Sequence, residues 1–77
     1  MKYADKVIDL MAPYPGRPFV MRQIIRYINP TAQAMERAAI KKAVQRVLVA
    51  LSATGQVSIK KAQALGGTSS YEWKTGT

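Results

Sequence analysis

The stretch IKKAVQRVLVALSATGQVSIK, residues 40–60, changes its hydrophobic period partway along. Up to Leu51 the apolar residues recur at three- and four-residue steps, which predicts a helix with one buried stripe. Gly55 suits the position just past a helix end, where a left-handed residue is common. From Gln56 to Lys60 apolar and polar residues alternate, as in a half-buried strand. The stretch therefore predicts a long helix that runs into a strand. The stripe consists of Ile40, Val44, Val47, Leu48 and Leu51.

Shorter helices are predicted on the N-terminal side of this stretch. The apolar spacing indicates one helix at Tyr3–Ala12 and another at Met21–Ile28. Prolines separate them and leave room only for a very short strand at Phe19–Val20. The long helix begins between Thr31, a suitable capping residue, and Ala38.

On the C-terminal side, Tyr71–Lys74 alternates apolar and polar residues again and predicts a second strand. The polar stretch Gly66–Ser70 would be the loop of a hairpin. In this hairpin the apolar residues of both strands face one side, namely Val57, Ile59, Tyr71 and Trp73.

Composition limits the classes of function. The 77 residues predict a single domain, 1–77, with a frayed tail at 75–77. Because the sequence has no Cys and no His, we expect no metal site, no cofactor and no nucleophile–His triad, so an enzyme is the least favoured class. No apolar run reaches the length of a membrane span and no motif indicates a small-molecule ligand. A cytoplasmic, basic binding protein is expected.

Charge is distributed unevenly along the chain. Twelve Lys and Arg face four Asp and Glu, which gives a formal net charge of +8. Between Leu10 and Tyr71 the only acid is Glu36. A surface with one sign of charge is typical of a protein that binds a polyanion. The bases of this segment are Arg17, Arg22, Arg26, Arg37, Lys41, Lys42, Arg46, Lys60 and Lys61.

The face of the long helix opposite the apolar stripe carries Lys42, Arg46 and Val49, with Gln45 at its edge. Arg, Lys and Gln are the side chains that bind base edges in the major groove of DNA. Arg22 and Arg26, four residues apart on the preceding helix, are suited to bind flanking phosphates.

The order of helix, short extended segment, helix, long helix ending in Gly and hairpin resembles the winged helix-turn-helix family over about Tyr3 to Lys74. In this resemblance residues 40–57 correspond to the recognition helix running into the wing. The segment Asn29–Ala38 is longer than the usual turn between the two helices. The resemblance implies an α+β fold with three helices and a C-terminal wing. It also implies binding of double-stranded DNA in transcription regulation, with Lys60 and Lys61 on the wing, near a phosphate or the minor groove.

The residues expected at this DNA interface are Arg22, Arg26, Arg37, Lys41, Lys42, Gln45, Arg46, Lys60 and Lys61. An ordinary solvated helix face explains Lys42 and Arg46 equally well. Lysines are also common on exposed strand edges, where they prevent edge-to-edge pairing, and this explains Lys60 and Lys61 without DNA. Tyr71 and Trp73 are more consistent with a lid on the core than with base stacking.

Two other functions remain open on sequence alone. A winged helix can act as a protein–protein adaptor, in which case Met35 and Val49 would contact a partner and the basic face would dock an acidic one. The same charge also suits an RNA-binding accessory protein. The sequence also leaves open that the protein forms a homodimer. Such a dimer would have to use the same surface elements as the functions above.

Overall fold

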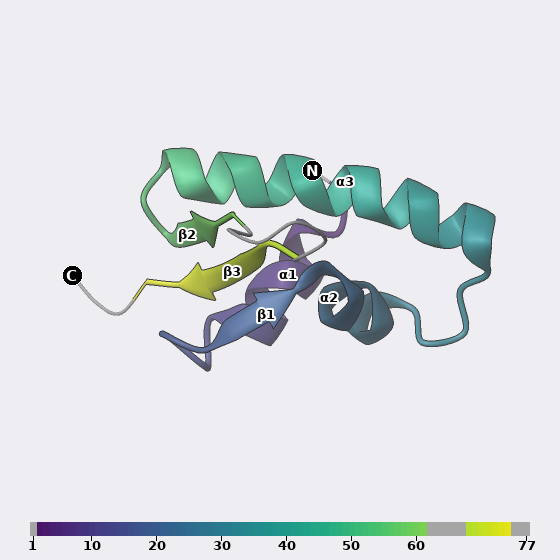
Figure 1. Cartoon of the computed structure of the whole chain (residues 1–77), viewed down its shortest axis with the longest axis horizontal. Coiled ribbons are helices and arrows are strands. Elements are labelled where there is room, and N and C mark those ends of the chain that lie inside the picture. The colour runs from purple at the N-terminus through teal and green to yellow at the C-terminus, as the bar shows by residue number, and fades with distance from the viewer. Residues whose placement is uncertain (1, 62–67, 75–77) are drawn as a thin grey trace.

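The computed structural model describes residues 2–61 and 68–74, and these form an α+β domain (Figure 1). The domain contains three helices and a small antiparallel sheet of three strands. The elements follow one another as α1 (Ala4–Met11), β1 (Pro18–Val20), α2 (Met21–Ile28), α3 (Ala34–Ala53), β2 (Val57–Lys60) and β3 (Ser70–Trp73).

The sheet contains one strand more than the predicted hairpin. Its strand order is β1-β3-β2, so β3 lies in the centre and pairs with both neighbours. Phe19 of β1 lies opposite Tyr71 of β3, and Ile59 of β2 lies opposite the same residue. The short segment at Phe19–Val20 is therefore a full partner in the sheet, and Phe19 holds it there because its ring is only 3% exposed.

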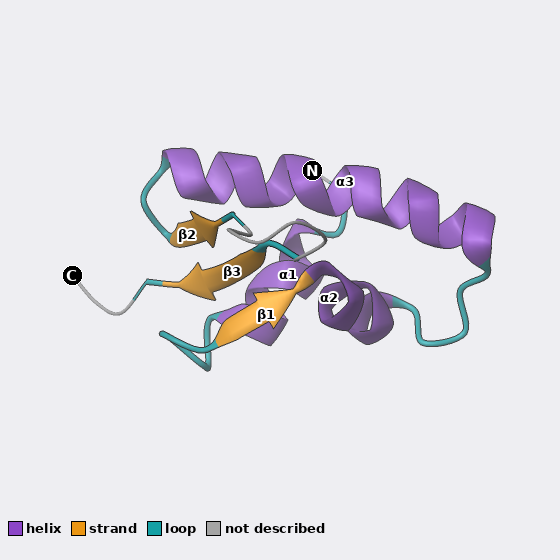
Figure 2. Ribbon diagram, viewed as in Figure 1, coloured by secondary structure: helices purple, strands orange, loops and turns teal. Residues whose placement is uncertain are grey.

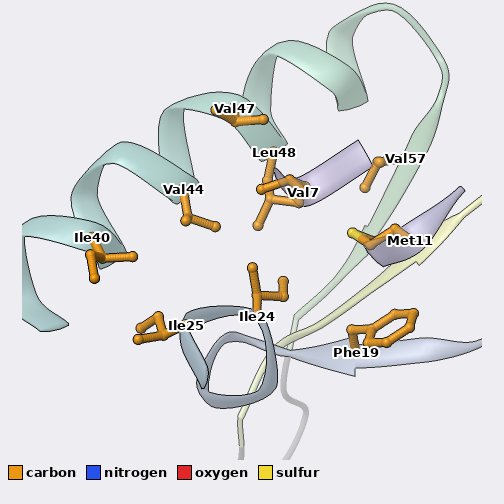
Figure 3. Packing of buried hydrophobic residues seen from close by; sticks show 10 residues of the cluster. All are labelled: Val7, Met11, Phe19, Ile24, Ile25, Ile40, Val44, Val47, Leu48 and Val57. Atoms are coloured by element: carbon orange, nitrogen blue, oxygen red, sulfur yellow. The ribbon is translucent and has the colours of Figure 1, made fainter. Parts of the chain in front are cut away.

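The helix α3 lies along one side of the molecule, over the sheet and α2 (Figure 2). Its inward side chains meet those of α1, α2 and the strands in one apolar cluster (Figure 3). Leu48, Val7 and Ile24 lie at the centre of this cluster. The buried residues are Val7, Met11, Phe19, Ile24, Ile25, Ile40, Val44, Val47, Leu48 and Val57.

One detail of the predicted core changes and another is confirmed. Leu51, expected in the buried stripe, is only half-buried and packs at the margin of the cluster because it lies near the end of α3. Tyr71 and Trp73 are also half-buried and pack against the cluster, which confirms them as part of its lid.

The bounds of α2 match the predicted range, while α1, β1, β2 and β3 differ from their predicted ranges by one residue at one or both ends. The helix α1 begins after Tyr3, whose φ of 69° is left-handed and cannot continue a helix. The helix α3 begins at Ala34, within the predicted range, but its N-cap is Gln33 and not Thr31. The Thr31 hydroxyl donates instead to Asn29 Oδ1 at 3.2 Å. Only residues 29–33 connect α2 and α3, so the connection is shorter than the sequence suggested.

Gly55 ends α3 as predicted. Its φ is +84°, a left-handed backbone conformation that residues other than glycine rarely adopt. The Gln56 N–H donates to the Leu51 carbonyl at 2.9 Å and the Gly55 N–H donates to the Ser52 carbonyl at 3.1 Å. This pair of bonds satisfies the last carbonyls of the helix and turns the chain directly into β2.

Candidate nucleic-acid interface

A groove between α2 and the N-terminal half of α3 brings four positive side chains together. Its volume is about 520 Å³ and it is open to solvent. Arg22 and Arg26 lie four residues apart on α2 and therefore share one face of that helix. Arg37 and Lys41 have the same spacing on α3, on the side facing α2. Between the cations the lining is formed by Met21, Ile25, Asn29, Pro30, Thr31 and Ala32.

Among the residues that the structure describes, no carboxylate lines this α2–α3 groove. In residues 2–61 and 68–74 the one ion pair within 4.0 Å joins Lys60 and Glu72, so none of the four groove cations is neutralised there. The nearest acid in sequence, Glu36, accepts a hydrogen bond from the Asn29 side chain at 3.4 Å. Four like charges around one open groove repel one another, and an anionic ligand would relieve that repulsion.

A second groove adjoins the first and shares Met21, Arg22 and Lys41 with it. It has a volume of about 470 Å³ and reaches the row where Val20, Ser70 and Lys60 lie side by side across the sheet. Polar donors and acceptors therefore continue from α3 toward the start of β3. Its other lining residues are Val20, Gln45, Thr68, Ser69 and Tyr71.

The side of α3 opposite the core forms a third part of the interface, which we call the outer face of α3. At 100° per residue its members lie within about 60° on either side of Lys42. Lys42, Gln45 and Arg46 are exposed there, as the sequence predicted. The outer face of α3 consists of Met35, Ala38, Ala39, Lys42, Gln45, Arg46, Val49 and Ala53, all exposed.

The two lysines of the predicted wing, Lys60 and Lys61, lie neither in the two grooves nor on the outer face of α3. Lys60 Nζ lies 3.1 Å from Glu72 Oε1, so the cation expected to bind DNA already has a partner on β3. Because strand side chains alternate, both residues lie on the sheet face opposite the buried Val57. Lys61 follows β2 and is exposed. Gly66 and Gly67 of the predicted polar loop lie outside the described residues.

The structure thus divides the predicted site into three parts. Arg22, Arg26, Arg37 and Lys41 meet in the α2–α3 groove, and Gln45 lines the second groove beside them. Lys42 and Arg46 lie on the outer face of α3, while Lys60 lies in β2 of the sheet and Lys61 directly follows it.

Arg17, a base outside the predicted site, also takes no part in the grooves. Its guanidinium lies over two aromatic rings, 5.4 Å from the Tyr14 centroid and 5.3 Å from the Phe19 centroid. This contact fixes Arg17 beside β1, where a cation stacked on aromatic rings stabilises the loop before the strand.

The sequence did not indicate that Asn29, Thr31 and Tyr71 line the grooves. From the sequence, Asn29 and Thr31 indicated only a turn. The alternation around Tyr71 predicted that its side chain faces the core, but it did not predict which residues lie beside it. Only the packing of α2 against α3, together with the pairing of β1 and β3, brings these three polar side chains to the cations.

Asp5 and Asp9 lie on α1, away from these grooves, and both are exposed. Throughout the described part of the chain, no three acidic side chains gather in a way that could hold a metal ion. Within the same residues no helix has the length and apolar character needed to span a membrane.

Comparison of the chain with protein-family models, with curated proteins and with solved structures found no match.

Proposed function

We propose that this protein binds double-stranded DNA, with α3 in the major groove, and that it acts in transcription regulation. The observation that carries the proposal is the α2–α3 groove, where four cations without a carboxylate partner line one open surface. Phosphate groups are the ligands that such a surface binds best, because guanidinium and ammonium groups form charge-assisted hydrogen bonds with them. The layout of three helices and a small antiparallel sheet is compatible with a winged helix.

The shape of α3 supports the choice of duplex DNA. An α-helix with its side chains is about 10–12 Å wide, which matches the width of the major groove. The 20 residues of α3 give it a length of about 30 Å. In this proposal Lys42 and Arg46 bind guanine edges and Gln45 binds adenine, since these pairings fit the base edges. The groove cations then bind phosphates beside the major groove.

The adaptor hypothesis receives less support from the surface. Met35 and Val49 are both exposed, but they lie about 21 Å apart along α3, at 1.5 Å per residue. Lys42 and Arg46 separate them, so the two side chains do not form a continuous apolar patch of the kind that binds a partner protein.

Fluorescence anisotropy with three labelled ligands tests the proposal. The full chain is titrated with a duplex DNA, a single-stranded RNA and heparin of similar charge, each at two salt concentrations. Retention of the duplex at the higher salt, after RNA and heparin have dissociated, supports duplex DNA as the ligand. Tighter binding of RNA at both salts would favour an RNA-binding accessory protein. Binding to none of the three would favour the adaptor.

A further inference from the structure

The outer face of α3 carries apolar side chains that the core does not use. Val49 is 61% exposed and Met35 is 88% exposed. Ala38 and Ala39 are also exposed. The water-facing side of a surface helix is ordinarily polar. Here the exposed apolar residues lie on the same side of the helix as Lys42, so this face offers apolar and charged groups to one ligand together.

The major groove of DNA offers both kinds of contact in a small space. Guanine presents two acceptors to a cation, while thymine presents its C5-methyl group, to which apolar side chains bind. On α3 the apolar and the charged positions alternate around the helix: Val49 lies about 20° from Lys42, and Arg46 lies about 40° to the other side. A ligand in contact with Arg46 and Lys42 therefore also meets Val49.

We propose that Val49 and Ala38 contact thymine methyl groups, so that the preferred ligand is duplex DNA whose site combines thymine with guanine. This inference rests on the proposed function and names its substrate more closely. Ala38 and Val49 lie about 16 Å apart along the axis of α3. That distance corresponds to about five base pairs, since successive base pairs rise by about 3.4 Å.

The same contacts would separate DNA from RNA. Uracil lacks the C5-methyl group, and the major groove of an RNA duplex is too narrow for a helix. Burial of one methyl-sized group is worth about 0.8 kcal/mol, which corresponds to about a fourfold change in the dissociation constant. Loss of a single thymine methyl at a contacted position should therefore weaken binding by about fourfold.

Selection followed by thymine replacement tests this inference. The full chain selects ligands from a random 20-base-pair duplex library, and each thymine of the best duplex is then replaced singly by deoxyuridine. At one or more positions the replacement should raise the dissociation constant about fourfold, with no change in salt dependence because the phosphates are untouched. Val49→Ala should reduce the difference between thymine and uracil at one of these positions, because the shorter side chain buries less of the methyl group. Alanine favours a helix, so α3 is retained in this variant.

A matched control is Tyr27→Ala, which shortens another exposed apolar side chain that lies on α2 and lines neither groove. It should leave the thymine preference intact. Equal affinity for thymine and uracil at every position, or selected duplexes without thymine, would overturn the inference while leaving DNA binding in place. A thymine preference that Val49→Ala does not change would overturn the role of Val49. Failure to bind any duplex would overturn this inference together with the proposed function.

Discussion

Removal of two groove cations should change the salt dependence of DNA binding by a predictable amount. The double variant Arg26→Gln, Arg37→Gln removes one cation from each wall of the α2–α3 groove. The groove and the outer face of α3 together bring six positive charges to the DNA, four to phosphates and two into the major groove. Neutralisation of six phosphate charges gives a log–log slope of affinity against salt of about −5. Because each lost phosphate contact flattens the slope by about one, the double variant should give a slope of about −3.

The assay is fluorescence anisotropy with one labelled duplex between about 50 and 200 mM salt, a range over which the wild type should lose about a thousandfold in affinity. The matched control is Lys2→Gln, Lys6→Gln, which removes the same charge from exposed residues in or beside α1 that line neither groove. Its slope should stay near −5. If both double variants flatten the slope equally, only the net charge matters and the groove is not a phosphate site.

Three further changes address the core, the base contacts and the wing. Leu48→Ala should lower the free energy of unfolding by about 2–5 kcal/mol in denaturant titration, because Leu48 is only 1% exposed at the centre of the core. Lys42→Ala combined with Arg46→Ala should remove discrimination among duplex sequences in competition binding and leave the thermal midpoint nearly unchanged, since both residues are exposed. Glu72→Gln should release Lys60 from its ion pair, raise the affinity for all duplexes alike and steepen the salt slope by up to about one.

Much of the fold could be predicted from the sequence because its signals are local. The predicted range of about Met21–Ile28 agrees with α2, since the isoleucine spacing indicates that helix and Pro30 marks its end. Gly55 marked the end of α3 by its conformational freedom alone. The pairing of β1 with β3 could not be predicted in this way. The three residues of β1 are too few to show an alternation of apolar and polar residues, and the partner strand lies about fifty residues further along the chain.

The candidate site was predictable as a list of residue types but not as a surface. The spacing of Lys42, Gln45 and Arg46 against the stripe determines their exposure, and the structure places all three in solvent. The meeting of Arg22 with Lys41 depends on how α2 packs against α3, which no spacing within either helix encodes. The partner of Lys60 was likewise hidden, because the register of β2 against β3 brings Glu72 to it.

The N-terminal end of α3 and the part that follows it have different roles. Residues 34–39 are all exposed, and the first buried residue of the helix is Ile40. The N-terminal end therefore projects beyond the core, with α2 facing it only across the groove. Because folding depends on the part from Ile40 to Leu48, the projecting end can carry Arg37 and Ala38 toward a ligand without a cost in buried surface. The helix dipole adds positive potential at that same end, where the groove cations already attract phosphate.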